Sequence, residues 1–223
     1  MKRFIAVILG LTLFSLSSYS QVPSPTIKQN GKGWESFFPK DWDLIMADSA
    51  DFNNDLREDY VFIFQADKDY CISKGLNPKF SPLPRILVIL MGVGEDSLEL
   101  GIKSDSVILT NGNGEGEPLV GGQGTGIKTD GNIFEINYAG GLSVQWTGQY
   151  KFQFKNKEWT LAYYRGTEYN TTDEDAPIKV FEVDFNKKFL KQDKVKTPMP
   201  NLPKLYMDKF KPRTVTIAPG IIL

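Results

Sequence analysis

The sequence contains no histidine and a single cysteine. Without histidine the chain cannot form a Ser-His-Asp or Cys-His nucleophile system, a histidine-ligated zinc site or a histidine general base. Because Cys71 is alone, no internal disulfide can form. A lone cysteine in an exported chain is either a reactive or dimerising thiol or a small buried apolar residue, and we expect the second.

Basic runs and long apolar runs are also missing from the body of the chain. Twenty-six lysines and arginines stand against 27 acidic residues; without Lys2 and Arg3, which belong to the N-terminal signal described next, 24 remain against 27, or about −3. This balance without a basic cluster predicts no nucleic-acid partner. No segment after residue 20 approaches the length of a membrane span.

The N-terminus has the pattern of a secretory signal peptide. Lys2 and Arg3 precede an apolar run from Phe4 to Leu16, and Ser18-Tyr19-Ser20 supplies small residues at a cleavage site before Gln21. No cysteine follows the run, which argues against a lipid anchor. We therefore expect a soluble, exported product, either periplasmic or extracellular.

Alternating apolar and polar residues predict strand after strand, separated by turn signals. The segment 85–91 is apolar on both faces and should lie at the centre of a sheet. The pattern predicts an all-β, single-domain antiparallel meander, a curved sheet or a sandwich, with few or no helices after the signal peptide. The expected strands cover residues 60–66, 85–91, 97–101, 106–110, 132–138, 143–154, 159–168 and 178–185, with a tight hairpin turn at 155–158.

We divide the chain into a signal peptide (1–20), a flexible lead-in (21–33), a β-rich domain (34–197) and a proline-rich C-terminal tail (198–223). Residues 68–84 read as an excursion loop, and the best helical candidate is 202–210. The tail either docks on the domain or stays frayed. An aromatic cluster near the start of the domain belongs either to the core or to a binding platform: Trp34, Phe37, Phe38 and Trp42.

One short segment, residues 51–59, carries a chemical signal. It reads Asp-Phe-Asn-Asn-Asp-Leu-Arg-Glu-Asp and precedes an apolar strand. Oxygen side chains at alternate positions of a short loop fold inward around a hard cation, which predicts a calcium site. Its ligands would be the side chains of Asp51, Asn53, Asp55 and Asp59 and the backbone carbonyl of Arg57.

The alternative is a solvated acidic turn, and two departures favour it. Leu56 occupies the position where such loops usually carry glycine for a left-handed turn, and Phe62 stands where a helix-loop-helix site has its bidentate glutamate. The second departure is expected when a strand follows the loop. The sequence leaves both interpretations open.

The segment 51–59 resembles the calcium loop of FG-GAP and integrin-type repeat proteins. The wider pattern over residues 34–190 resembles a group of exported, uncharacterised bacterial proteins. In that group a Phe-x-Pro-x-x-Trp stretch, here residues 37–42, precedes one such loop, and a Gly-Gly-x-Ser segment, here 140–143, leads into aromatic strands. The resemblance implies a calcium site but no activity. A single copy of the loop argues against a full propeller.

No catalytic set emerges from the remaining residues. The glycine-rich segment 111–126 precedes a strand, whereas a phosphate-binding loop precedes a helix. Acidic residues are available for acid–base chemistry, but the sequence pairs no two of them. We therefore expect a non-catalytic binding or envelope-associated module of unknown ligand, with a glycan and an envelope component as the candidate ligands. The alternatives are a carboxylate-dependent glycan hydrolase or carbohydrate-binding protein, and a purely structural role.

Overall fold

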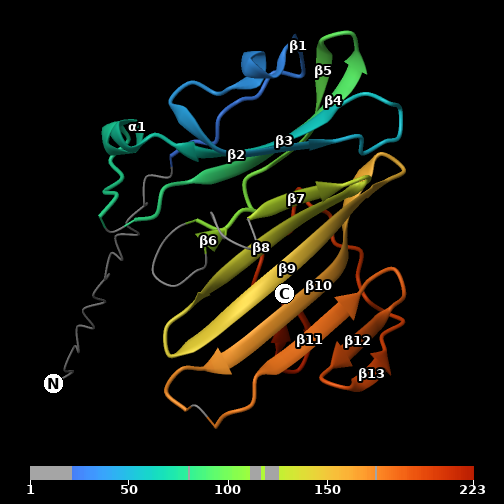
Figure 1. Cartoon of the computed structure of the whole chain (residues 1–223). Helices are drawn as coiled ribbons and strands as arrows, with labels where there is room; N and C mark the ends of the chain where they lie inside the picture. The colour runs from blue at the N-terminus through green and yellow to red at the C-terminus, as the bar shows by residue number, and fades with distance from the viewer. Residues whose placement is uncertain (1–21, 80, 111–116, 119–125, 174) are drawn as a thin grey trace, which may run out of the picture.

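The computed structural model describes residues 22–79, 81–110, 117–118, 126–173 and 175–223, so the expected signal peptide and most of the glycine-rich segment lie outside it. The described chain forms antiparallel sheets, and the predicted all-β fold is confirmed. The five-stranded sheet lies across one end of the eight-stranded sheet (Figure 1).

The five-stranded sheet has the order β1-β5-β4-β3-β2, so the doubly apolar segment is central, as predicted. Every residue from Arg85 to Met91 is buried, because layers cover both faces of this strand. The strands are β1 (Asn30–Lys32), β2 (Trp42–Ala50), β3 (Asp59–Ala66), β4 (Arg85–Gly94) and β5 (Ser97–Ser104).

The eight-stranded sheet has the order β13-β12-β11-β10-β9-β8-β6, with β7 also paired to β8. The predicted hairpin joins β9 to β10 through Asn156 and Lys157, both with positive φ. Its strands are β6 (Glu117–Pro118), β7 (Ile127–Asp130), β8 (Ile133–Gly141), β9 (Val144–Lys155), β10 (Glu158–Asn170), β11 (Lys179–Asp184), β12 (Phe189–Gln192) and β13 (Val195–Pro198).

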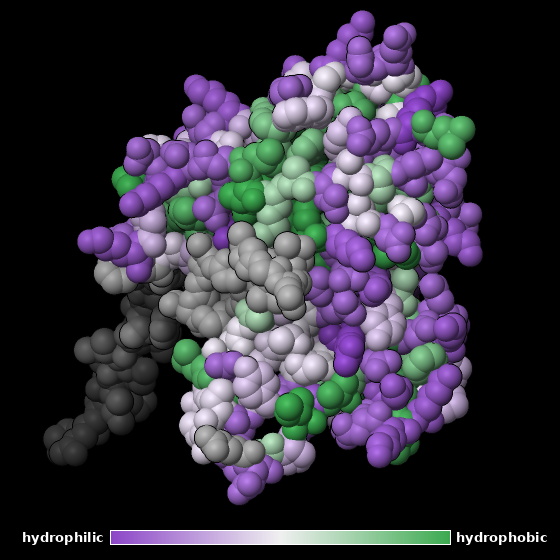
Figure 2. Space-filling model, viewed as in Figure 1, coloured by the Kyte–Doolittle hydropathy of each residue, from purple (hydrophilic) through white to green (hydrophobic). Residues whose placement is uncertain are grey.

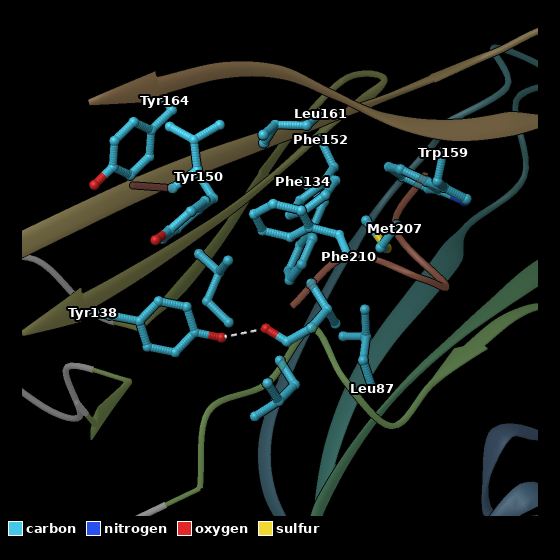
Figure 3. Packing of buried hydrophobic residues seen from close by; sticks show 14 of the residues in the cluster. Leu87, Phe134, Tyr138, Tyr150, Phe152, Trp159, Leu161, Tyr164, Met207 and Phe210 are labelled. Carbon is cyan, nitrogen blue, oxygen red and sulfur yellow. Dashed lines mark hydrogen bonds between the residues drawn. The ribbon is translucent and has the colours of Figure 1, made fainter. Parts of the chain in front are cut away.

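The main core lies between the two sheets and is rich in aromatic side chains (Figure 3). Val61 and Leu87 enter it from the five-stranded sheet, and Phe134 and Phe152 from the eight-stranded sheet. Burial of this apolar surface is the main force that holds the sheets together. The Tyr138 hydroxyl donates a 2.8 Å hydrogen bond to the carbonyl of Val107, so its polar end is satisfied within the core.

Two glycines make room for tyrosines in this core. Gly148 on β9 pairs directly with Gly166 on β10. A Cβ on Gly148 would lie 2.9 Å from the ring of Tyr150, and one on Gly166 would lie 2.6 Å from the Tyr164 hydroxyl. The tyrosine rings therefore occupy space that any other residue at these two positions would fill.

A second apolar cluster covers the opposite face of the five-stranded sheet. Val22 and Ile27 are buried there, and β1 pairs with β5, so residues 22–33 pack on the sheet where we expected a flexible lead-in. The expected loop 68–84 also contains a short helix, α1 (Lys68–Ser73), capped by Asp67. The sequence pattern did not predict the packing of residues 22–33 or the helix α1, because each segment contributes only a few apolar side chains to the cluster.

The C-terminal tail docks on the domain and runs behind the eight-stranded sheet in Figure 1. Met207 and Phe210 are buried in the main core, and Ser104 donates a 3.1 Å hydrogen bond to the carbonyl of Met207. Residues 202–210 form no helix, contrary to expectation; their backbone instead bonds to β10 through Trp159 and Leu161. The tail adds the hairpin β14 (Thr216–Ala218) and β15 (Ile221–Ile222).

Residues 106–110 form no strand either, although Val107, Ile108 and Leu109 are buried. Tertiary contacts determine the conformation of this segment. The Ser106 hydroxyl, for example, donates a 3.0 Å hydrogen bond to the carbonyl of Phe210 in the tail. The segment therefore fills the space between the sheet and the tail.

The outer face of the eight-stranded sheet is polar, and much of it appears purple or pale in Figure 2. Glu135 accepts hydrogen bonds of 2.9 Å from Asn137 and Gln149 and forms a 2.9 Å ion pair with Lys151. Partial burial of Glu135 acts to raise its pKa, but these donors outweigh it and lower the pKa overall. Glu135 is thus held in a network of hydrogen bonds and one ion pair on this face of the sheet.

Candidate functional site

The acidic loop connects β2 to β3 at the right-hand end of the five-stranded sheet in Figure 1. Ala50 and Asp59 form the last cross-strand pair before it. Asn54 and Leu56 both have positive φ, at 60° and 67°. Leu56 is 95% exposed, so its side chain gains nothing from packing that would offset the strained backbone.

Side-chain oxygens of the loop turn inward to its own backbone. Asp51 accepts from the N–H groups of Asp55 and Leu56 at 3.1 and 2.8 Å, through different carboxylate oxygens. Asn53 Oδ1 accepts from the same Asp55 N–H at 2.9 Å, and Asp55 accepts from the N–H of Arg57 at 2.9 Å. Three of the predicted ligands therefore converge on one tight turn.

The fourth side chain, Asp59, plays a different part. It is fully buried, and its two oxygens accept hydrogen bonds of 2.8 Å from the N–H groups of Phe52 and Gly92. Burial raises the pKa of Asp59, against the lowering effect of these N–H donors, and repulsion from Asp55 and Asp51 adds to the increase. Asp59 therefore anchors the loop to the protein interior.

The loop includes one positive charge. The guanidinium of Arg57 forms a 3.0 Å ion pair with Asp55 Oδ2, and the amide of Asn53 donates to that same oxygen at 3.1 Å. Desolvation acts to raise the pKa of Asp55, but these donors and the backbone of Arg57 lower it overall. Asp55 is thus a stable carboxylate, the form that a calcium ligand requires.

Within the described ranges, no group of three or more histidine, cysteine, aspartate or glutamate side chains is placed to hold a metal ion. The donor set of the loop fits calcium only in part. It offers the Asp51 and Asp55 carboxylates, the Asn53 amide oxygen and the Arg57 carbonyl, all hard oxygen donors, while Asp59 is turned toward Phe52 and Gly92.

A groove of about 400 Å³ adjoins the loop, and sequence reasoning missed it. Residues from three separate stretches of the chain meet there, so no local motif marks it. The stretches are the start of the short 3₁₀ helix at Trp34–Phe37, the loop end at Arg57–Tyr60, and the β4–β5 turn. The groove is lined by Gly33, Trp34, Glu35, Arg57, Glu58, Tyr60, Gly92, Gly94, Asp96, Ser97 and Leu98.

Glu58 is held firmly at the edge of the groove. Its two oxygens accept hydrogen bonds from the hydroxyls of Tyr60, at 2.6 Å, and Ser49, at 2.7 Å. These two bonds lower the pKa of Glu58. The bond to Glu58, partial burial and the nearby carboxylates of Glu58, Asp96 and Glu35 raise the pKa of Tyr60 to about 12.

The early aromatic cluster is divided between core and groove. Phe37 and Trp42 are buried in the second apolar cluster. Trp34 is 36% exposed and lines the groove, with its ring centroid 6.0 Å from that of Phe62. The core interpretation therefore holds for Phe37 and Trp42, whereas a binding platform at Trp34 stays a prediction.

The remaining candidates are structural or lie outside the described residues. Cys71 is a buried free thiol on α1, and burial raises its pKa, so the small apolar role holds. The glycine-rich segment 111–126, in which we expected no phosphate-binding loop, lies mostly outside the described residues. Among the helices of the described part, none has the length and apolar character needed to cross a bilayer.

Comparisons with known protein families, with curated proteins and with solved structures found no match to this chain.

Proposed function

We propose that this protein is an exported, non-catalytic binding module in which the loop at residues 51–59 binds calcium as a structural brace. The observation that carries the proposal is that the Asp51 carboxylate accepts hydrogen bonds from the N–H groups of both Asp55 and Leu56. It curls the loop so that alternate oxygens face its interior, the arrangement that hard cations use. The resemblance to FG-GAP-type loops supports the same conclusion.

Asp51, Asn53, Asp55 and the Arg57 carbonyl would hold the ion, and water would complete the six to eight oxygens that calcium takes. The ion would offset the repulsion between the Asp51 and Asp55 carboxylates. Asp59 holds the loop to the protein interior, because it accepts hydrogen bonds from the N–H groups of Phe52 and Gly92. We assign it this anchoring role in place of direct ligation.

The brace would act on the groove, because Arg57 and Glu58 belong to both. Calcium would hold the backbone that presents these two side chains. A preformed groove with fixed walls binds a ligand at a lower entropic cost than a mobile one. The module would be periplasmic or extracellular, where millimolar calcium suits a weak site.

Glu58 supports a binding role over a catalytic one. A general acid in glycoside hydrolysis needs a raised pKa, whereas hydrogen bonds from Tyr60 and Ser49 lower the pKa of Glu58. The alternative function, carbohydrate binding or hydrolysis, is favoured by one observation: the rings of Trp34 and Tyr60 line the same groove as carboxylates. Incubation with polysaccharides, followed by a reducing-end assay, tests hydrolysis directly.

Calorimetry and thermal unfolding of the chain from Gln21 test the calcium brace. We expect a dissociation constant of about 10⁻⁴–10⁻³ M, and a rise in stability of about 1–2 kcal/mol at a few millimolar calcium. Asp55→Ala should abolish both signals, whereas Asp43→Ala, at an exposed position on β2, should leave both intact. Identical melting in calcium and in chelator, with no heat of binding, would refute the brace.

Export has its own test. N-terminal sequencing of the protein recovered from outside the cytoplasm should begin at Gln21. Recovery of the chain only in the cytoplasm, with Met1 retained, would contradict it.

A further inference from the structure

The groove beside the loop has an excess of negative charge. Glu35, Glu58 and Asp96 line it, and all three are exposed at its edges. Arg57 is the single basic residue among the lining residues, and its guanidinium is paired with Asp55 at 3.0 Å. The groove therefore favours a positively charged ligand.

One wall of the groove is aromatic. Tyr60 stacks on Phe62 with ring centroids 6.0 Å apart and planes inclined by 4°, and Trp34 lies 6.0 Å from Phe62 on centroids. Phe62 is buried, so it supports the two rings that reach the groove. Tryptophan and tyrosine faces attract organic cations through their π electrons.

The three carboxylates and the aromatic wall line the same groove. The carboxylates of Glu58, Asp96 and Glu35 all bear on the Tyr60 hydroxyl, which donates to Glu58 at 2.6 Å. The three carboxylates, from residues 35, 58 and 96, thus line the same groove as the aromatic wall, and Glu58 contacts that wall directly. A cation held there would meet a ring face and carboxylate oxygens together.

We propose that this groove binds an organic cation, an apolar chain that ends in an ammonium group, supplied either by a free amine or by a lysine side chain. The proposal deepens the binding role proposed above, and rests on it in that the groove binds and does not react. Trp34 and Tyr60 contact the chain and the ammonium group. Asp96 and Glu35 hold the charge, while Glu58 stays bonded to Tyr60 and Ser49 and fixes the tyrosine. The volume of about 400 Å³ lies at the lower end of small-ligand pockets.

Calorimetry with 1,5-diaminopentane, at low salt and with calcium present, tests the ligand class. The neutral comparator is 1,5-pentanediol, which has the same chain length. We expect the diamine to bind at least about tenfold more tightly than the diol, and high salt to weaken its binding, because exposed charges carry part of the affinity. Trilysine identifies the source: tighter binding than the diamine indicates a peptide, and weaker binding indicates a free amine.

Three variants locate the site. Asp96→Asn combined with Glu35→Gln should weaken diamine binding by about tenfold, because two carboxylates are neutralised. Asparagine suits the positive φ of 53° at position 96, so the turn should keep its shape. Trp34→Phe should weaken binding by a smaller factor while preserving the packing on Phe62. Glu99→Gln, an exposed carboxylate of β5 outside the groove, is the matched control.

Three results would overturn the proposal. They are the absence of diamine and trilysine binding at millimolar concentration, equal affinity for the diol, and an affinity that the double variant leaves unchanged. Binding of a neutral oligosaccharide with dependence on Trp34, in place of the diamine, would also overturn it and favour the glycan alternative. Repeating the titration in chelator separates this proposal from the calcium brace, since the brace is judged by calcium heat and melting alone.

Discussion

The Asp59 carboxylate accepts a 2.8 Å hydrogen bond from the backbone N–H of Gly92, 33 residues further along the chain. Its other oxygen accepts from the N–H of Phe52 at the same distance. A Cβ at position 92 would lie 2.8 Å from the Glu58 carbonyl and 2.9 Å from Arg57 Cβ, so only glycine lets β4 pass this close to the loop. The loop, the groove and the central strand are joined at this one point.

Replacing Asp59 should therefore remove the hydrogen bonds that attach the loop to β4 and lower the stability of the protein. Asp59→Ala leaves two buried N–H groups without their acceptor, at about 1–3 kcal/mol each. Urea denaturation should show this loss in free energy of unfolding, and the exposed control Asp43→Ala should change it by less than about 0.5 kcal/mol. A loss in Asp59→Ala no larger than in the control would mean that Asp59 is not the anchor.

The raised pKa of Asp59 gives a pH dependence of known sign. A carboxyl whose pKa is higher in the folded state than in the unfolded state favours folding when protonated. The contribution of Asp59 to stability is complete below its pKa in the unfolded state, and it is lost as pH rises through its pKa in the folded state. The stability of the wild type minus that of Asp59→Asn should therefore fall as pH rises from about 3.5 to 7.

Other carboxylates titrate over the same range, but they are present in both chains, and those distant from Asp59 cancel in the difference. Denaturation curves of the two proteins at matched pH values provide the measurement. A difference that stays level or increases with pH contradicts the assigned shift.

Leu56→Gly should stabilise the loop. Leu56 holds φ at 67° with its side chain in solvent, and a left-handed backbone costs a residue with a Cβ about 1–2 kcal/mol. Glycine relieves this cost but gains freedom in the unfolded chain, so we expect a net gain of about 0.5–1 kcal/mol in chelator. Calcium should also bind more tightly. Leu44→Gly, within β2 where no left-handed turn exists, should destabilise and serves as the contrast.

The β9–β10 hairpin offers a second backbone test. Lys157 has a φ of 63°, at the position where two-residue hairpins prefer glycine. Lys157→Gly should raise stability by about 0.5–1 kcal/mol, measured by thermal unfolding. Lys194→Gly, in the β12–β13 turn, is the control, because position 194 has no positive φ and gains no relief. Equal effects in the two turns would argue against the backbone explanation.

Gly166→Ala should strain the core. The new methyl would lie 2.4 Å from the Phe181 ring and 2.6 Å from the Tyr164 hydroxyl, and overpacking of this kind costs about 1–3 kcal/mol. The added cost should appear as a lower melting temperature and altered near-ultraviolet tyrosine signals. Gly131→Ala provides a comparison, because its Cβ meets nothing within 4 Å and only its φ of 52° is strained. Near-ultraviolet signals should change in Gly166→Ala alone.

The sequence by itself determined the strands and their class. Period-two alternation and β-branched and aromatic residues located β8 to β11, since a half-buried strand requires that pattern. Short apolar runs located β3 and β4, and the doubly apolar run at 85–91 indicated a central strand because both of its faces are covered. The acidic loop was found because its side chains interact with backbone only a few residues away.

Only the tertiary structure decided the rest. The orientation of the Asp59 side chain depends on the N–H group of Gly92, far along the chain. The groove forms only because three separate segments bring Trp34, Tyr60 and Asp96 together. The docking of the tail depends on Met207 and Phe210 finding space left open by the sheets. Each of these outcomes is set by long-range contacts, whose free energy is fixed only after the sheets have formed and which leave no local pattern in the chain.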